Sequence, residues 1–392
     1  MRFLRLTGSW CGASRREISP KMSLSRVGLC ALSFFAEIVF LLGAVLCVFA
    51  VGPASNSARA RRAGTATASP PYAWVHEMRV EGHLALHYSP AGAFSPDGSS
   101  LAIVERRRVV LVNVASGSVE KAVQPSFRNV KNLDIQSANY ISPDHLFILA
   151  AGKAKLKGRH GSVRTPELAF QWDIPRNALL GKVEAVGAKG GFEPPVYLPL
   201  AKILVLYKKG TYFLWNPLTG LTQSLTLTQL THPAHLFAFS PDGRWLLLAQ
   251  IEANASPNPV VVLLKQHAFV NVLPGHQGTV LSMTFSPGGK ILQTSCEDGK
   301  VRLWSVPGWN LLAALKGNLG PVHWAEFSPD GQYIASAGED DTVRIWQVAT
   351  GKLIQTLEES KHPLLTVTFS PNGKYLAASS DRAVHVWVRT QE

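Results

Sequence analysis

A five-residue phrase occurs five times in this chain, and its spacing constrains the fold more than any other feature. The copies begin at Phe94, Phe239, Phe285, Phe327 and Phe369 and read FSPDG, FSPDG, FSPGG, FSPDG and FSPNG. Serine, proline, an Asp or Asn and glycine, in that order, are the preferences of a type I turn. The Phe before each turn and the apolar run after it are typical of strands. Each copy is therefore predicted to form the tip of a hairpin.

The turn prolines predict the number of repeats, because a fixed long period indicates a repeat architecture. Two degenerate copies of the turn, at Pro143 and Pro199, divide the 145 residues between Pro96 and Pro241. An insertion around 153–165 explains the longest step. Seven turns then follow one another at steps of 42 to 56 residues: Pro96, Pro143, Pro199, Pro241, Pro287, Pro329 and Pro371.

A strand that ends in tryptophan follows most of these turns at a near-constant distance. The clearest copies read VRLW, VRIW and VHVW, which are β-branched, aromatic and alternating and so favour strands. The tryptophans are Trp172, Trp215, Trp304, Trp346 and Trp387, while repeat 1 has Val112 and repeat 4 has the run 260–264. An acid stands six residues before the last three tryptophans, at Asp298, Asp340 and Asp381.

With these landmarks, residues 73–392 resemble the WD40-repeat family of β-propellers. Repeat 5 is the best match, with Gly275-His276, Thr294, Asp298 and Trp304 at the family's positions. The resemblance implies an all-β, seven-bladed β-propeller in which His276, Thr294, Asp298 and Trp304 form a structural, hydrogen-bonded tetrad. Repeat 6 departs from the pattern with Asn318 in place of His, and repeat 7 is expected to have Ala377 at the Ser/Thr position.

The last repeat contains only three strands, so its blade lacks an outer strand. The strand-like segment 73–80 lies directly before Gly82-His83, where an outer strand should lie. We expect this segment to complete the last blade, because a closed ring leaves no exposed sheet edge.

The segment 27–52 is apolar, with one charge at Glu37. As a helix it would reach about 39 Å, more than the ~30 Å of a bilayer core. It is predicted to be a transmembrane helix or a signal sequence, preceded by a basic tail (1–26) and followed by a flexible linker (53–72). A buried soluble helix is the third interpretation.

The flanking charges predict the orientation of this segment. Six basic residues precede it and three follow it within ten residues, which favours a single-pass protein with an extracytoplasmic propeller. The alternative is a secreted or periplasmic protein, because 38–51 fits a signal-peptide core and Ala58-Arg59-Ala60 fits a cleavage site.

Charge and motif content narrow the function. The net charge is +13, but nine basic and two acidic residues precede residue 63, so the rest has 30 basic and 24 acidic residues. This balance does not indicate a specific nucleic-acid-binding domain. The sequence has no P-loop, no His-Glu-x-x-His and no Gly-x-Ser-x-Gly motif. We therefore predict no catalytic, cofactor-binding or metal-binding residues, and a non-enzymatic protein.

The turns between second and third strands carry the candidate partner-binding residues. In repeats 1 to 3 these turns are basic, and equivalent loops of a repeat protein emerge on the same side. We expect a basic crescent that binds proteins with an acidic surface, formed by Arg106, Arg107, Arg108, Lys153, Lys155, Lys157, Arg159, Arg164, Lys208 and Lys209. In repeats 5 and 6 the same turns are acidic, with Glu297-Asp298 and 339–341.

The resemblance and the absence of catalytic motifs together predict a membrane-anchored scaffold for protein–protein interaction. Two other functions stay open: an enzyme or small-ligand receptor with its site at the central channel, and a polyanion-binding module. Convergent acids or histidines at the channel would favour the first, and a steep salt dependence of binding would favour the second.

Overall fold

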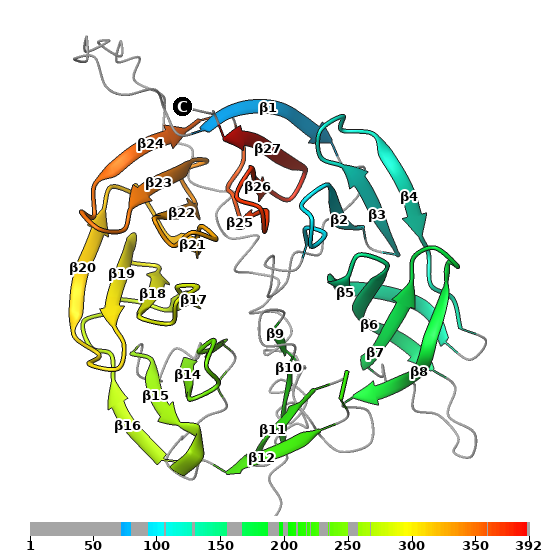
Figure 1. Cartoon of the computed structure of the whole chain (residues 1–392), viewed down its shortest axis with the longest axis horizontal. Helices are drawn as coiled ribbons and strands as arrows, with labels where there is room; N and C mark the ends of the chain where they lie inside the picture. The colour runs from blue at the N-terminus through cyan, green and yellow to red at the C-terminus, as the bar shows by residue number, and fades with distance from the viewer. Residues whose placement is uncertain are drawn as a thin grey trace, which may run out of the picture. The chain divides into compact units, whose positions relative to one another are not determined.

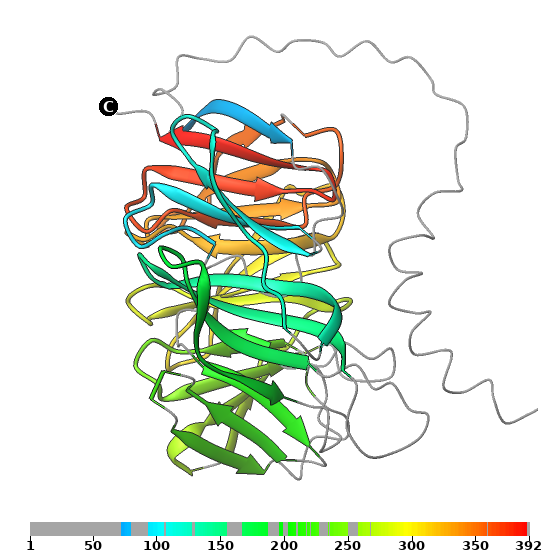
Figure 2. The same ribbon diagram turned by 90° about the vertical axis from the view of Figure 1, so that its right-hand side faces the viewer.

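Seven antiparallel sheets stand around a common centre in the computed structural model of the protein and form a closed ring (Figure 1). The predicted all-β, seven-bladed propeller is therefore confirmed. The structure describes residues 72–79, 93–105, 107–127, 130–154, 167–186, 196–198, 203–208, 211–216, 218–219, 221–226, 234, 236–249, 258–266, 268–358 and 360–389. In Figure 2 the same sheets are seen from the side, with their strands running across the thickness of the ring.

The basic tail (1–26), the apolar segment (27–52) and nearly all of the linker (53–72) lie outside the described residues. Within the described part of the chain, no helix has the length and apolar character needed to cross a membrane.

Each blade is a meander of consecutive strands. Blade 1 contains β2 (Ser100–Glu105), β3 (Arg108–Asn113) and β4 (Val119–Val123); blade 2 contains β5 (Val130–Ser142), β6 (His145–Ala154), β7 (Glu167–Asp173) and β8 (Ala178–Val186); blade 3 contains β9 (Val196–Leu198), β10 (Ile203–Lys208), β11 (Thr211–Trp215) and β12 (Thr222–Thr226). Blade 4 contains β13 (Leu236–Phe239), β14 (Trp245–Ala249), β15 (Val260–Leu263) and β16 (Ala268–Val272), with a 3₁₀ turn at Leu264–Gln266; blade 5 contains β17 (Val280–Phe285), β18 (Ile291–Cys296), β19 (Lys300–Ser305) and β20 (Leu311–Lys316); blade 6 contains β21 (Val322–Phe327), β22 (Tyr333–Gly338), β23 (Val343–Gln347) and β24 (Leu353–Leu357).

Blade 7 closes the ring by combining the two ends of the domain. It contains β25 (Thr366–Phe369), β26 (Tyr375–Ser379), β27 (Ala383–Arg389) and, as its outermost strand, β1 (Tyr72–Arg79). β1 pairs antiparallel with β27, from Tyr72 opposite Arg389 to Arg79 opposite Ala383. The segment predicted to complete the last blade does so, one residue earlier than the predicted 73–80.

The repeated phrase forms the turn before the second strand of a blade; in blade 1 this second strand is β2, because Phe94 bridges to Leu101 in the place of a first strand. In blade 1 the backbone N–H of Gly98 donates to the carbonyl of Ser95 at 2.8 Å, and Gly98 has a φ of +73°. The Ser95 hydroxyl donates to Asp97 at 2.5 Å and accepts from the Ser100 backbone at 2.9 Å. A residue other than glycine is strained at this φ, which explains the glycine of the phrase.

The strand that ends in tryptophan is the third strand of each blade, and it pairs with the second strand in the same register in all seven blades. The tryptophan of the third strand, or the valine that replaces it, pairs with a Leu or Ile of the second strand. The pairs are Leu101–Val112, Leu146–Trp172, Leu204–Trp215, Leu246–Val262, Leu292–Trp304, Ile334–Trp346 and Leu376–Trp387.

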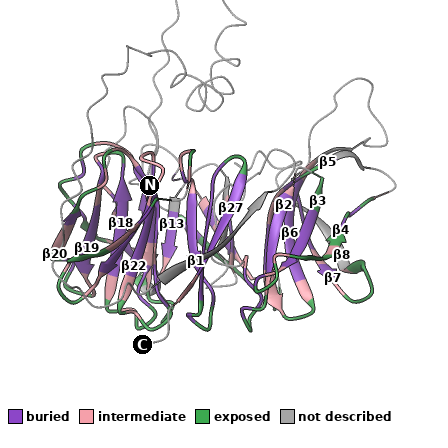
Figure 3. Ribbon diagram, turned by 90° about the horizontal axis from the view of Figure 1, so that it is seen from above, coloured by how far each residue is buried: buried purple, intermediate pink, exposed green. Residues whose placement is uncertain are grey.

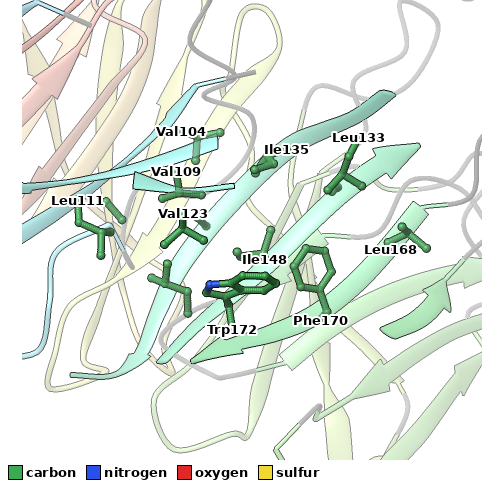
Figure 4. Close-up of a cluster of buried hydrophobic side chains, with 14 residues drawn as sticks. Val104, Val109, Leu111, Val123, Leu133, Ile135, Ile148, Leu168, Phe170 and Trp172 are labelled. Atoms are coloured by element: carbon green, nitrogen blue, oxygen red, sulfur yellow. The ribbon is translucent and has the colours of Figure 1, made fainter. Parts of the chain in front are cut away.

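The apolar core is divided among the contacts between neighbouring blades. Figure 4 shows the layer between blades 1 and 2, where Val109 and Val123 face Ile148 and Trp172. A comparable cluster lies between every other pair of neighbours, including blades 7 and 1. Figure 3 shows the buried residues concentrated on the inner strands. The second strands of blades 5 and 6 are therefore buried on both faces, along five of the six residues of β18 and of β22.

Polar side chains cross two of these layers near the centre of the ring. Gln293 of blade 5 donates to the backbone carbonyl of Ala325 in blade 6 at 2.6 Å, and the Ala325 N–H donates to Ser282 at 3.0 Å. On the other face of β21, Glu326 accepts a hydrogen bond from Thr368 of blade 7 at 3.2 Å.

Glu326 is a carboxyl group with incomplete hydrogen bonding. Its Oε2 is buried and has no partner in hydrogen-bond geometry. Burial raises the pKa of Glu326 to about 8, and interactions with Thr368, the Phe369 backbone and the Trp324 side chain lower it only in part. The residue as a whole is half-buried, but the atoms that would carry the charge are enclosed between blades 6 and 7. Glu326 is therefore protonated at neutral pH.

We expect Glu326→Gln to stabilise the propeller. The folded state holds a proton that the unfolded chain releases above its ordinary pKa of 4.5, so stability falls as pH rises from about 4.5 to about 8. Glutamine keeps an acceptor for Thr368 without this cost, and the gain at pH 7 should be on the order of 3 kcal/mol. Urea unfolding of both proteins at pH 5, 7 and 8 measures it, and parallel pH profiles would contradict the assignment.

Candidate functional site

The turns between second and third strands lie on one face of the ring, which we call the hairpin face. The turns with the repeated phrase lie on the opposite face, which we call the FSPDG face. This arrangement follows from the meander of each blade, in which alternate turns emerge on alternate sides. Blades 1, 2 and 3 are consecutive in the ring, so the strand ends that flank their predicted basic turns are neighbours on the hairpin face (Figure 1).

The described residues of the basic crescent are at or beside these turns. Arg107 is exposed in the turn before β3. Arg108, the exposed first residue of β3, hydrogen-bonds Glu105. Lys153 lies near the end of β6, and Lys208 is the last residue of β10. The other predicted members lie outside the described residues: Arg106, Lys155, Lys157, Arg159, Arg164 and Lys209.

In blade 5 three residues of the predicted tetrad form one buried chain of hydrogen bonds. The Trp304 indole N–H donates to Thr294 Oγ1 at 3.1 Å, and Thr294 Oγ1 lies 2.9 Å from His276 Nε2. His276 Nδ1 lies 3.1 Å from the carbonyl of Leu273, which can only accept, so Nδ1 carries the proton. Nε2 then accepts from the Thr294 hydroxyl. Burial and the nearby Arg302 charge lower the pKa of His276 to about 4, so the ring is neutral.

Asp298, the fourth member, bonds other groups. Arg302 donates to both carboxylate oxygens, at 2.5 and 3.2 Å, and the Gln277 N–H donates at 3.2 Å. Arg302 also donates to the Gly275 carbonyl at 2.6 Å. Burial raises the pKa of Asp298, but the hydrogen bonds from Arg302 and Gln277 outweigh it and bring the pKa to about 2. Asp298 and Arg302 thus form a buried ion pair that ties the loop at Gly275 to the blade.

Blade 6 contains the same network with asparagine in place of histidine. The Trp346 indole donates to Ser336 at 2.9 Å, and Ser336 donates to Asn318 Oδ1 at 3.4 Å. Arg344 donates to Asp340 at 2.5 Å and to Asn318 at 3.2 Å. Asn318 therefore lies where His276 does, and connects the tryptophan chain to the ion pair.

Blade 7 lacks both the hydrogen-bond chain from the tryptophan and the ion pair, and the structure corrects the predicted Ser/Thr position. Thr294 pairs with Arg302 and Ser336 with Arg344, and the matching pair is Ala378 with His385. Ala378, and not Ala377, is the residue at the Ser/Thr position, because the turn that follows its strand, between the second and third strands, is one residue shorter in blade 7. With no hydroxyl there, the buried Trp387 indole N–H has no hydrogen-bond partner.

The ion pairs change the charge of the hairpin face. Asp298 and Asp340 are each neutralised by a buried arginine, with side chains 5 to 8% exposed. Glu339 is hydrogen-bonded to His323 Nε2 at 2.7 Å. The acidic side over blades 5 and 6 is therefore weaker than the residue count predicts. The sequence contained the signal that was missed: Asp298 and Arg302 are four residues apart, as are Asp340 and Arg344, at the same place in two repeats.

The described residues hold no group of three or more His, Cys, Asp or Glu side chains suited to a metal ion. Cys296 is buried, and burial raises the pKa of its thiol to about 11, so the nucleophilic thiolate is scarce at neutral pH.

Comparison with protein families finds three matches to the family described as WD domain, G-beta repeat, at residues 268–305, 309–347 and 351–388. Each match begins with the outer strand of one blade and ends with the third strand of the next, for example β16 to β19. No curated protein matches the sequence. This one-strand offset between repeat and blade is the reason why the last blade needs β1 as its outer strand.

We expect Asp298→Ala to destabilise the propeller more than Asp97→Ala does. Removal of Asp298 leaves the Arg302 guanidinium buried without its counter-charge, at a cost of about 3 kcal/mol or more. Asp97 lies in an exposed turn, and its loss should cost about 0.5 kcal/mol. Urea unfolding at pH 7 compares the two variants, and equal midpoints would rule out the ion pair.

The same pair predicts a pH dependence. Because the folded pKa of Asp298 is about 2 against an ordinary value of 3.8, its stabilisation is complete above about pH 4 and is lost as pH falls towards 2. The difference in unfolding free energy between the natural protein and Asp298→Ala should shrink over that range.

We expect Ala378→Ser to stabilise blade 7. The new hydroxyl would take the place that Ser336 has in blade 6 and accept from the Trp387 indole, for a gain of about 1 kcal/mol. Ala377→Ser is the matched control, because Ala377 lies in the apolar layer against blade 1, where a hydroxyl lacks a partner. That control should lose about 1–3 kcal/mol. Thermal unfolding of both variants tests the register, and a stabilised control would reverse the assignment.

Proposed function

The chain belongs to the WD40-repeat β-propeller family, and from this we propose that it is a non-enzymatic scaffold, anchored in a membrane by residues 27–52, that binds another protein through its hairpin face. WD40 propellers are typically protein-interaction scaffolds. The basic crescent favours a partner protein whose docking surface is acidic.

One observation carries the choice of face. Blades 1, 2 and 3 are consecutive, and the exposed Arg107 and Arg108 lie on the same face as the ends of β6 and β10, where Lys153 and Lys208 stand. Neighbouring basic turns reinforce one another's electrostatic potential, which steers an acidic surface and raises the association rate. Over blades 5 and 6, buried arginines neutralise Asp298 and Asp340. The protein's own acidic turns therefore compete less with an acidic partner for the basic crescent.

Glu326 bears on the alternative function, an enzyme or small-ligand receptor with its site at the central channel. Perturbed carboxyls often belong to functional sites. The groups that act on Glu326 are Thr368, the Phe369 backbone and Trp324, and none of them is a second acid or a histidine. A carboxyl without a converging titratable group supports an interblade contact better than a catalytic centre.

The proposal predicts that charge reversal in the crescent slows partner binding. The full chain, immobilised in detergent, first captures the partner. The double variant Arg107→Glu, Arg108→Glu should then lower the association rate and flatten its salt dependence, while the dissociation rate changes little. Arg244→Glu is the matched control, because Arg244 is an exposed arginine on the FSPDG face. Equal association rates for all three proteins would reduce the crescent to a solvated surface.

The anchor has its own test. Six basic residues before 27–52 and three after it favour a cytoplasmic N-terminus. A reporter that is active only outside the cytoplasm, fused at the C-terminus, should be active. Activity of a cytoplasm-only reporter would refute the orientation, and a full-length chain with an intact N-terminus in the soluble fraction would refute the anchor.

A further inference from the structure

Three consecutive outer strands expose large aliphatic side chains at the same place, one in blade 4 and a pair in each of blades 5 and 6. These side chains, which we call the rim stripe, are 42 to 55% exposed and come from blades 4, 5 and 6: Val270, Leu311, Leu312, Leu353 and Ile354. Each blade has a β-bulge at this place, between residues 261/262, 303/304 and 345/346 of the third strand. Val270, Leu312 and Ile354 are the extra residues of the three bulges, so their positions in the blades are equivalent.

The strands that carry the rim stripe are depleted in charge. β16, β20 and β24 read AFVNV, LLAALK and LIQTL, with no acidic residue and one lysine, Lys316. Blade 1 has a bulge in the same register, and there the extra residue is Glu120, which accepts hydrogen bonds from Ser100 and Asn113. An outer strand of this fold can therefore carry a charge at the bulge, and blades 4 to 6 carry an aliphatic residue in its place.

The rim stripe continues towards the point where the chain enters the ring. Blade 7 follows blade 6, and its outer strand β1 has a bulge in the same register, between Trp74 and His76, so that Val75 is the extra residue. This bulge is two residues from Tyr72, the first residue of the propeller. The 19 residues 53–71 separate Tyr72 from the apolar segment 27–52, and a flexible chain of that length would span roughly 25 Å on average. The chain therefore enters the propeller at the same level of the rim as the rim stripe.

We propose that the rim stripe rests in the headgroup region of the bilayer that residues 27–52 cross, so that the propeller is held with its rim against the membrane. The inference rests on the proposed anchor. Aliphatic side chains on a surface without acids enter an interface at little electrostatic cost, and the tether keeps them close to it. The stripe lies near the start of each outer strand, which is the side of the FSPDG face. This orientation leaves the basic crescent on the opposite face free for its partner.

Segment 27–52 folded back on the propeller is a weaker candidate for the occupant. Fifteen of its 26 residues are Leu, Ile, Phe or Val, so as a helix it would present apolar side chains on every side. One contact with the rim would leave most of that surface in water, whereas a bilayer covers all of it.

Lipid-quenching of a fluorophore tests the proposal on the full chain. Cys11, Cys30 and Cys47 are changed to Ser, and the buried Cys296 is kept. An environment-sensitive label is attached to Leu312→Cys or Ile354→Cys, and to Glu120→Cys as the matched bulge in blade 1. The proteins are reconstituted in vesicles of phosphatidylcholine and phosphatidylglycerol, with and without shallow spin-labelled lipid. We expect a blue shift and loss of emission at 312 and 354, and neither at 120.

The other outcomes separate the rim contact from the anchor. Chains that float with the vesicles but show no quenching at 312 and 354 would overturn the rim contact and leave the anchor standing. A blue shift without quenching would mean that protein covers the stripe, either a second copy or residues 27–52, and equal quenching at all three sites would remove the preferred orientation. Chains that do not float would overturn both proposals.

Discussion

Burial between neighbouring blades is the interaction on which the rest of this structure depends. Each apolar layer is shared by two sheets. Between blades 1 and 2, for example, Val109 of one sheet and Trp172 of the other belong to the same cluster. A single blade therefore cannot bury the residues on its second and third strands, and every blade needs two neighbours. The pairing of β1 with β27 matters for the same reason, because it completes blade 7, which covers the layers on both sides of it. Stability in this fold belongs to the closed ring.

The same layers decide which polar groups are tolerated inside. Gln293 and Ser282 reach backbone groups of the next blade and are satisfied there. Glu326 reaches Thr368 with one oxygen and leaves the other without a partner, so it carries a proton. The networks of blades 5 and 6 lie farther from the centre, where an ion pair holds the preceding loop. Structural polar groups therefore occupy the blades with the most regular repeats, and the candidate binding residues lie in blades 1 to 3, whose repeats have diverged.

The architecture was predictable from the sequence because turns and strand ends are local. Pro96 and its equivalents mark the hairpins, and the tryptophans mark the third strands, so the number of blades follows from counting. The closing strand was predictable from the missing fourth strand of the last repeat. The partners of Asp298 were harder to predict, because Arg302 stands on a buried strand where an apolar residue is expected. The Ser/Thr position of blade 7 was assigned to Ala377 and not to Ala378 because the turn between the second and third strands is one residue shorter there. The aliphatic residues at the bulges can be recognised only when the strand register is known.

The candidate site was predictable in composition and less so in its electrostatics. The sequence places basic residues in three successive turns, and the ring makes those turns neighbours. It does not say which charges are already paired: Arg108 meets Glu105, and Asp298 and Asp340 meet arginines from their own blades. Such pairings depend on side-chain direction across a hairpin, which a count of charges along the chain does not contain.

The antiparallel pairing of β1 with β27 has a mechanical consequence. Tyr72 lies opposite Arg389, so the chain enters and leaves the ring at the same end of one strand pair. A force applied between the N-terminal segment and the C-terminus would load the Tyr72–Arg389 contact first and then each following pair in turn. Strands pulled from one shared end separate like a zipper, whereas strands pulled from opposite ends must break all their hydrogen bonds together. The junction that seals the ring against thermal opening is thus the part of the propeller that would yield first under tension.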